Sequence, residues 1–294
     1  MSALTLRVAI ADYPHVRALR DGTVRSDRVA FRFESIAPIS RAFRPMVRDL
    51  AFDLSEMAVA TLAQAHARGV PIVGLPIVLM RGFHHAALVC RADSTLRPED
   101  LAGARIGVRA FSQTTGVWLR GILAETYGLR PEQSHWITTE GAHVADSPDP
   151  DFVSRAAAGA DLAALLRAGE IAAGIALTGL AAGETRSVIP DAAAAAAAWY
   201  RRTGIYPVNH ALALQRRLVA EHPWLPGELA ALFAAAKEAA PPVPVPVPVA
   251  VLGGADPLPY GLEANRAAIE TLMRYAHADR LIPRVYAADD IFLS

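Results

Sequence analysis

Segments with the apolar pattern of strands and of helices alternate along the first 80 residues. Alternation of this kind favours a mostly parallel sheet with helices on both of its faces. The predicted order is strand, strand, helix, strand, helix, strand, at Leu4–Ile10, Val29–Ser35, Ile39–Asp49, around Leu54, Ala60–Arg68 and Ile72–Val78.

The same alternation restarts after a further strand at His85–Cys90 and a helical turn at Pro98–Leu101. A third phase begins with the helix Ala192–Arg202 and continues into the strand His210–Leu214. The remaining predicted elements are the strands Arg105–Val108, Trp136–Thr138 and Ile171–Leu177 and the helices Thr114–Tyr127, Asp161–Ala168, Arg216–Glu221, Pro226–Ala240 and Leu262–Ala278.

Two α/β units, one inserted in the other, account for this order. The predicted fold class is α/β, with two doubly wound lobes joined by crossover segments near His84–Arg91 and Tyr206–Leu214. Residues 1–84 with 214–294 form the first lobe in this prediction, and residues 85–213 form the inserted second lobe. A ligand cleft between the lobes is the expected consequence. Pro241–Pro248, where proline and valine alternate, is expected to be a polyproline II connector.

Composition narrows the classes of function. The 294 residues are 53% hydrophobic and 20% charged, as expected of a globular protein. The 29 basic and 29 acidic residues balance, so the protein has no net charge that would favour binding to nucleic acid. A Schiff base or a pyridoxal phosphate anchor would have to use Lys237, the only lysine, which lies in an alanine-rich helix poorly suited to a catalytic amine. Cys90 is the only cysteine, which excludes an intramolecular disulfide and a cysteine-rich metal site.

The amino terminus and the apolar runs bear on where the protein works. Met1-Ser2-Ala3 leads directly into a strand, without the basic segment and apolar stretch of a signal peptide. No apolar run reaches the roughly 18 residues that a membrane span needs. The alanine run Ala192–Ala198 is too short. The sequence therefore predicts a cytoplasmic protein without a membrane span.

Polar residues follow the predicted strands at their carboxyl ends, where open α/β sheets bind small ligands. Asp12 and Tyr13 follow the first strand, and Ser55 and Glu56 lie in the short stretch Asp53-Leu54-Ser55-Glu56-Met57. Arg44 lies in the helix-like run that precedes this stretch. The arrangement predicts a site for a small anionic molecule.

A second candidate anion site is Ser112-Gln113-Thr114, between a predicted strand and the helix Thr114–Tyr127. Hydroxyl and amide groups at a helix start, together with free backbone N–H groups, suit a carboxylate or a phosphate. The alternative is that Ser112 or Thr114 only caps the helix, and the two roles are compatible.

Candidate acid–base groups occur at both predicted crossovers. A guanidinium such as Arg81 can bind a carboxylate with two hydrogen bonds, and imidazoles such as His84 and His85 exchange protons near neutral pH. Adjacent residues of an extended segment face opposite sides, so at least one of these two histidines is expected to be structural. Tyr206 and His210 enter the second crossover, and His210 is either a site residue or an interior histidine.

A metal site is the remaining alternative for these side chains. It would combine Glu56, His210 and one of His84 and His85. No recognisable spacing of metal ligands supports this combination, so no metal is predicted.

Five blocks of sequence resemble those of a known protein family: Phe43–Arg48, Phe52–Met57, Val117–Leu123, Tyr200–His210 and Pro259–Leu262. Together they resemble the 4,5-dihydroxyphthalate decarboxylase family, and the Ser-Glu-Met and Thr-Gly-Ile-x-Pro sequences are the most specific parts. The resemblance runs in order from about Val8 to Phe292, nearly the whole chain. The family resembles type 2 periplasmic solute-binding proteins in fold, which agrees with the inserted-lobe prediction.

The chain departs from the family pattern in two segments. It has Val78–Arg81 and Phe83–His85 where the family carries Phe-Pro-Ser-Arg and Phe-Arg-His. It has Phe111–Thr114 where the family tends to carry Tyr-Gln-Met-Thr. The scaffold tolerates such changes, whereas the ligand contacts are expected to differ.

The resemblance implies a decarboxylase, a lyase acting on a small aromatic carboxylate such as 4,5-dihydroxyphthalate by acid–base chemistry without a cofactor. A non-catalytic solute-binding protein or sensor for a small carboxylate is the alternative, and a homo-oligomer is left open. The candidate catalytic residues are Glu56, His84, His85 and His210. The candidate substrate contacts are Arg44 and Arg81, which would bind a carboxylate with Ser112, Gln113 and Thr114, and also Asp12, Tyr13, Ser55, Tyr206 and Tyr260.

Overall fold

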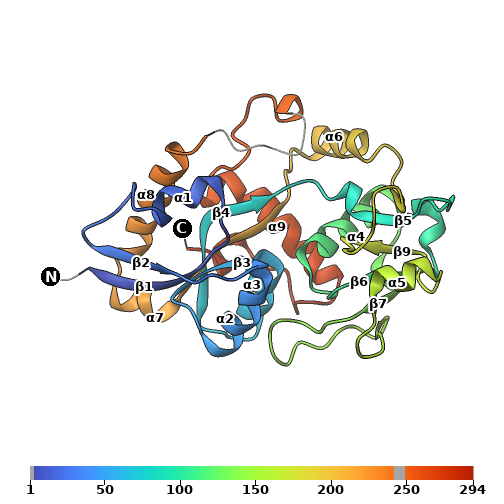
Figure 1. Cartoon of the computed structure of the whole chain (residues 1–294), viewed down its shortest axis with the longest axis horizontal. Helices are drawn as coiled ribbons and strands as arrows, with labels where there is room; N and C mark the ends of the chain where they lie inside the picture. The colour runs from blue at the N-terminus through green and yellow to red at the C-terminus, as the bar shows by residue number, and fades with distance from the viewer. Residues whose placement is uncertain (1–2, 242–248, 294) are drawn as a thin grey trace. The chain divides into compact units, whose positions relative to one another are not determined.

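The computed structural model describes residues 3–241 and 249–293, which divide into two compact units (Figure 1). The first unit comprises the residues up to Arg81 together with 208–269 and 286 onward; the second comprises 82–207 and 270–285. Most of the predicted polyproline II connector, residues 242–248, lies outside the described residues.

The unit boundaries differ from the predicted ones at 84/85 and 213/214. The chain leaves the first unit after Arg81 and returns at Val208, because these two residues still pair in the first sheet. Residues 270–285 group with the second unit and not with the first lobe as expected. The cause is helix α9 (Leu262–Ala278), which begins in the first unit and ends in the second.

The first unit is built on a five-stranded sheet with the order β2-β1-β3-β11-β4. Strand β1 pairs in parallel with β2 and β3, whereas β11 is antiparallel to both β3 and β4. The strand that returns from the second unit is therefore a central strand of the first. The five strands are β1 (Leu4–Ala9), β2 (Val29–Phe33), β3 (Leu54–Ala58), β4 (Ile72–Arg81) and β11 (Val208–Gln215).

Apolar strands and amphipathic helices form the core of this unit. All five residues of β3 are buried, as expected of a strand covered on both faces. One core cluster joins Leu6, Leu54 and Leu212 from the strands to Leu229 and Phe233 from α8. The helices that lie wholly in this unit are α1 (Arg17–Arg20), α2 (Phe43–Asp49), α3 (Val59–Ala67), α7 (Arg216–Glu221), α8 (Leu225–Glu238) and α10 (Ala288–Ile291).

The second unit contains a six-stranded sheet with the order β10-β5-β9-β6-β7-β8. Strands β9, β6, β7 and β8 are parallel, and β5 is antiparallel to both of its neighbours. The strands are β5 (Leu88–Arg91), β6 (Arg105–Val108), β7 (His135–Thr138), β8 (Val153–Arg155), β9 (Ala173–Ile175) and β10 (Thr185–Ser187), and the helices are α4 (Thr114–Tyr127), α5 (Leu162–Arg167) and α6 (Ala192–Thr203).

Short 3-10 helices account for several differences from the predicted elements. The predicted strand His85–Cys90 begins with a 3-10 turn and becomes extended only at Leu88. The edge strands β8 and β10 were not predicted, because three residues are too few to show an alternating pattern. The 3-10 helices are Pro14–Val16, Ile39–Ala42, His85–Ala87, Pro98–Leu101, Pro131–Gln133 and Val249–Leu252.

The predicted α/β class is confirmed, with helices alternating with strands in both units. Four predicted elements, Arg105–Val108, Thr114–Tyr127, Arg216–Glu221 and Leu262–Ala278, begin and end where the structure places them. In the part of the chain that the structure describes, every helix is too short or too polar to span a membrane.

The packing of α4 on α9 generates a stability prediction. A Cβ atom added to Gly121 would lie 2.1 Å from Cδ2 of Tyr275, so Gly121→Ala should lower the free energy of unfolding by roughly 1–3 kcal/mol. Gly227→Ala in α8 is the matched control, because no atom lies within 4 Å of the added Cβ. It should raise stability by about 0.5–1 kcal/mol. Urea unfolding measures both changes, and an unchanged midpoint for Gly121→Ala would contradict this close packing.

Candidate functional site

Four strands bring candidate residues to one edge of the first sheet. The carboxyl ends of β1, β3 and β4 lie at this edge, because β1 and β3 are parallel and β11 is antiparallel to both β3 and β4. Strand β11 therefore begins there, and His210 lies near its start. Tyr13 follows β1, Glu56 lies in β3 and Arg81 ends β4. This is the edge at which open α/β sheets bind ligands.

The Glu56 carboxylate is the centre of this group. Its side chain has no solvent exposure, and it accepts three hydrogen bonds. The backbone N–H of Ala11 donates to Oε2 at 3.0 Å, the Tyr13 hydroxyl donates to Oε1 at 2.7 Å, and Nδ1 of His210 lies 2.6 Å from Oε1. Burial raises the pKa of Glu56, but these hydrogen bonds and the charge of His210 outweigh it and leave the pKa below its usual range. Glu56 is therefore an ionised carboxylate near neutral pH.

The ionised Glu56 fixes the orientation of His210. Because a carboxylate only accepts, Nδ1 of His210 carries the proton that faces Oε1. The Phe43 ring meets the imidazole edge-on, with centroids 5.2 Å apart. The His210 side chain retains 14% exposure, whereas Glu56 has none. An imidazole held at Nδ1 by a carboxylate can accept and donate a proton at Nε2, which is the arrangement of a general base and its orienting group.

Tyr13 and Ser55 have their hydroxyls bound within the protein. Tyr13 donates to Glu56, its ring stacks on His15, and burial followed by the Glu56 charge raises its pKa. The Ser55 hydroxyl is fully buried and donates to the backbone carbonyl of Glu56 at 2.9 Å. Both were expected to contact the substrate. In the structure the Tyr13 hydroxyl holds the Glu56 carboxylate and the Ser55 hydroxyl holds the backbone of β3, and their contact with a substrate stays a prediction.

The expected carboxylate-binding residues of the first unit differ in their surroundings. Asp12 is exposed and forms an ion pair with Arg17 at 3.3 Å. Arg44 lies on the exposed side of α2, one residue after Phe43. Arg81 is half-buried, and its Nη1 donates to the side chain of Asn265 at 3.2 Å.

Tyr260 lies in the loop before α9. Its ring is beneath the Lys237 ammonium, with Nζ 4.9 Å from the ring centroid. The Tyr260 hydroxyl is buried and makes no hydrogen bond within the described residues. Burial, followed by the charge of Asp256, raises the pKa of this hydroxyl. It is a neutral donor without an acceptor in the described part of the chain.

His84, His85 and Tyr206 belong to the second unit, whereas Glu56 and His210 belong to the first. His84 and His85 are both buried. The His85 ring lies 6.2 Å from Phe83 and 5.9 Å from Trp199 between centroids, and burial followed by the Arg202 charge lowers its pKa to about 4. Tyr206 packs on the same Phe83 at 4.9 Å. His85 is thus a neutral member of an aromatic cluster.

The predicted anion site of the second unit lies at the start of α4. Ser112 is 2% exposed, and its hydroxyl makes no hydrogen bond among the described residues. The same holds for Oε1 of Gln113, the residue that precedes the helix. Thr114, the first helical residue, is also buried. The Ser112 hydroxyl, a possible donor beside the N–H groups of a helix start, suits an anionic ligand, whereas Oε1 of Gln113 can only accept a hydrogen bond.

A buried ion pair supports this turn and was missed by the sequence analysis. Arg120 and Asp279 are each 1% exposed, and Nε and Nη2 of Arg120 both donate to Oδ2 of Asp279, at 2.9 and 2.7 Å. Nη2 also donates to the backbone carbonyl of Phe111 at 2.7 Å. Burial raises the pKa of Asp279 to about 6, although Arg120 opposes it. An arginine inside the apolar run of α4 was the available signal.

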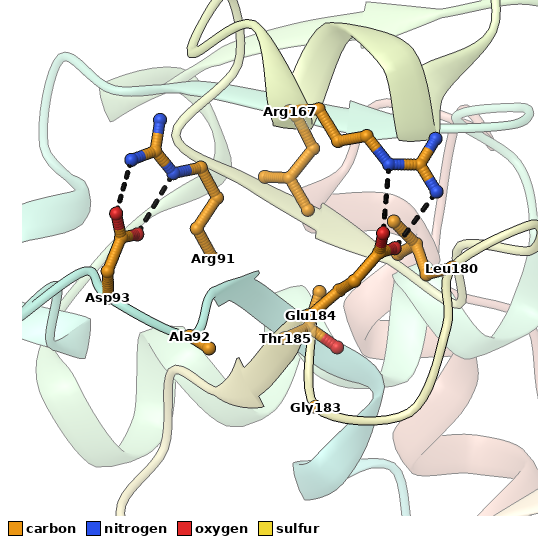
Figure 2. A pocket seen from close by; sticks show the side chains of 9 residues that line it. Arg91, Ala92, Asp93, Arg167, Leu180, Gly183, Glu184 and Thr185 are labelled. Atoms are coloured by element: carbon orange, nitrogen blue, oxygen red, sulfur yellow. Dashed lines mark hydrogen bonds and ion pairs between the residues drawn. The ribbon is translucent and has the colours of Figure 1, made fainter.

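A hollow of about 290 Å³ lies in the second unit, and Figure 2 shows side chains that line it. Two ion pairs flank it, Arg91 with Asp93 at 2.5 Å and Arg167 with Glu184 at 2.9 Å. Each guanidinium faces its own carboxylate, so the charges of the hollow cancel. This hollow is therefore less suited to binding a small anion than the start of α4 is. In the described part of the chain, no three or more histidine, cysteine, aspartate or glutamate side chains are grouped so as to hold a metal ion.

Two curated proteins are similar to this chain in sequence. A 4,5-dihydroxyphthalate decarboxylase of Comamonas testosteroni is 30% identical over 258 residues, which cover 82% of this chain and 77% of that protein. A protein of the same name from Pseudomonas putida is 32% identical over 139 residues, 47% of this chain and 54% of that one. No protein-family model matches the chain.

Solved structures share the fold at low sequence identity. The alkanesulfonate-binding protein SsuA from Xanthomonas axonopodis pv. citri has a TM-score of 0.56 at 14% identity, with 99% of both chains covered. The periplasmic aliphatic sulphonate-binding protein SsuA from Escherichia coli has a TM-score of 0.57 at 14% identity, with 100% of this chain and 92% of that one covered. These values show a periplasmic-binding-protein fold, which confirms the fold predicted from the sequence.

The surroundings of His85 generate a prediction about acid stability. Folded His85 has a pKa of about 4 against 6.5 for a free imidazole, so the unfolded chain binds more protons between these values. Stability is therefore lost as the pH falls from 6.5 toward 4. His85→Phe, which keeps a ring beside Phe83 and Trp199, should reduce this loss. Urea unfolding at pH 7.5 and pH 4.5 measures it, with the pH 7.5 value as the control for packing. An equal loss in variant and wild type would contradict a neutral buried His85.

Proposed function

The chain belongs to the 4,5-dihydroxyphthalate decarboxylase family, and from this premise we propose that it is a carboxy-lyase. Its proposed substrate is a small aromatic carboxylate such as 4,5-dihydroxyphthalate. The reaction replaces one carboxylate of the ring with a proton and releases carbon dioxide, without an organic cofactor. The same proposal has the protein working in the cytoplasm, in the catabolism of aromatic compounds.

The chemistry makes three demands on the protein. A ring hydroxyl para to the leaving carboxylate must lose its proton so that the oxygen can push electrons into the ring. The ring carbon that carries this carboxylate then takes up a proton, and carbon dioxide leaves with restoration of the aromatic ring. The second carboxylate must be held so that the ring is oriented for both proton transfers.

The Glu56–His210 pair is the observation that carries this proposal. Glu56 holds Nδ1 of His210 at 2.6 Å, which leaves Nε2 to exchange a proton with the substrate. We assign His210 the proton transfer and Glu56 its orientation, because Glu56 itself is fully buried. His84 and His85 receive no proton-transfer role in this proposal, because both are buried and His85 is held neutral among aromatic rings.

Carboxylate binding is assigned to residues of each unit separately. Arg81 lies at the same sheet edge as His210, on the neighbouring strand β4. In the second unit, Ser112 and Gln113 have polar atoms without a partner among the described residues, at the start of α4 beside Thr114. Arg44, Asp12, Tyr206 and Tyr260 stay in the proposal as further substrate contacts.

Release of carbon dioxide from purified protein tests the activity. We expect product formation from 4,5-dihydroxyphthalate, followed by liquid chromatography and by trapped carbon dioxide. Phthalate, which lacks the hydroxyl groups, should bind without being consumed. Saturable binding of such diacids without product from any hydroxylated aromatic acid would instead favour the solute-binding alternative.

Replacement of His210 tests the proton-transfer assignment. His210→Gln should lower kcat by about 10²–10⁴-fold, because a glutamine keeps a donor toward Glu56 but cannot carry a proton. His135→Gln, at the exposed start of β7, is the matched control and should keep wild-type kcat. Circular dichroism and the melting temperature establish that both variants fold. A kcat within threefold of wild type for His210→Gln would remove His210 from the reaction.

Replacement of Tyr13 tests the support of Glu56. The Tyr13 hydroxyl lowers the pKa of Glu56, so Tyr13→Phe should raise that pKa and shift the acid limb of kcat to higher pH. KM at pH 8 should stay within about twofold, because Tyr13 gives its hydroxyl to Glu56 and not to the substrate. A pH–rate profile from pH 5 to 9 measures both. A large rise in KM with an unmoved acid limb would restore Tyr13 as a substrate contact.

A further inference from the structure

The buried amide of Asn265 makes three hydrogen bonds on the first turn of α9. Its Nδ2 donates to the backbone carbonyls of Pro259 and Gly261, each at 2.9 Å. Its Oδ1 accepts from Nη1 of Arg81 at 3.2 Å. Since both carbonyls require a donor, the amide has one satisfactory orientation, with its oxygen toward the guanidinium. Asn265 is 1% exposed, so this orientation is fixed by its surroundings.

An amide orients a guanidinium without cancelling its charge, and this distinguishes the contact from an ion pair. Arg217, at the other end of β11, shows the difference. Its Nε donates to Oε1 of Gln215, whose Nε2 in turn donates to the carbonyls of Leu50 and Phe52. That geometry repeats the one around Asn265, but Arg217 also forms an ion pair with Asp53 at 2.7 Å. The Gln215 arrangement is therefore a structural counterpart in which the arginine also pairs with a carboxylate.

The loop that Asn265 holds carries a second donor. Tyr260 lies between the two carbonyls bound by Asn265, and its buried hydroxyl has no acceptor among the described residues. The backbone N–H of Gly261 donates to the carbonyl of Pro76 in β4 at 2.8 Å, and Gly261 has a φ of +97° that favours glycine. These contacts tie the loop to the strand that ends at Arg81.

Lys237 and Asp256 close the other side of the same loop. The Lys237 ammonium binds the Asp256 carboxylate and donates to the carbonyl of Leu258 at 2.5 Å. Burial raises the pKa of Asp256, but Lys237 and, to a smaller extent, the charge of Arg81 lower it overall. The nearby carboxylate is thus already bound by an ammonium.

We propose that Asn265 is a positioning residue that makes the site selective for aromatic dicarboxylates. It holds the Arg81 guanidinium and the Tyr260 loop together so that the second carboxylate of the substrate is bound at the end of β4. Arg81 pairs with Val208, two residues before His210 on β11, which places this carboxylate at the sheet edge of the proton-transfer group. The inference rests on the proposed function and deepens it.

Asn265→Asp tests this role directly. The change keeps the size and the oxygen that faces Arg81, adds a negative charge there and removes both donors to the loop. KM for 4,5-dihydroxyphthalate should rise about tenfold or more, because a charge-assisted contact weakens, while kcat changes less than threefold. The dissociation constant of phthalate, measured by calorimetry, should rise in parallel, whereas that of benzoate should change less than threefold.

Two further variants separate positioning from loop stability. Asn265→Leu removes the same hydrogen bonds without adding charge, so its effect on KM should be smaller than that of Asn265→Asp. Gln215→Glu is the matched control at the other end of β11, and it should leave KM and phthalate binding unchanged even where the melting temperature falls. A wild-type KM and a wild-type phthalate dissociation constant in Asn265→Leu would show that the amide does not position Arg81, and would overturn the proposal.

The outcomes for wild type keep this inference distinct from the activity. If wild type binds phthalate but forms no product, the enzyme proposal fails, and a loss of binding in Asn265→Asp still supports the positioning role. If wild type turns over the substrate and Asn265→Asp keeps wild-type KM, only the positioning role fails. Should Asn265→Asp not fold, Arg81→Gln replaces it, and an unchanged preference for phthalate over benzoate in that variant overturns the proposal.

Discussion

The arrangement of the first unit depends on satisfying one buried carboxylate. Glu56 has no solvent exposure, and an ionised carboxylate is stable there only with several donors. The donors come from Ala11 and Tyr13 after β1 and from His210, which lies 154 residues after Glu56. The hydrogen bonds therefore form only when β1, β3 and β11 are paired in this register. The same contacts that stabilise the sheet edge set the tautomer of the proposed proton carrier.

Amides and carboxylates play different parts around the arginines of this protein. Carboxylates pair with Arg120 and Arg217, and in those places the guanidinium serves the structure. In the second unit, Arg120 joins α4 to the end of α9 and holds the carbonyl before Ser112. An amide holds Arg81 at the sheet edge that also carries His210. An amide therefore orients Arg81, whereas a carboxylate both orients Arg120 or Arg217 and offsets its charge.

The order of elements and most candidate residues could be predicted from the sequence, but their pairing could not. Apolar periodicity gave the elements, because helices and strands differ in the spacing of buried positions. The contact of Glu56 with His210 depends on the register of β11, a long-range property that no local pattern carries. Ser55 and Tyr13 have polar side chains at strand ends, yet hydrogen bonding inside the protein uses their hydroxyls. Asn265 lies in the amphipathic helix α9, and Asp279 directly follows it. No local sequence pattern marks either residue as buried.

The central position of β11 has a consequence for how the chain is made. Strands β3 and β4 emerge early in synthesis and have no direct pairing with each other, since β11 lies between them. The position between β3 and β4 stays empty until residues 82–207 and then β11 have left the ribosome. During that interval two unpaired strand edges are exposed, which is the condition that invites wrong pairing with other chains. Completion of the first sheet is therefore a late event in biosynthesis, after residues 82–207 have been made.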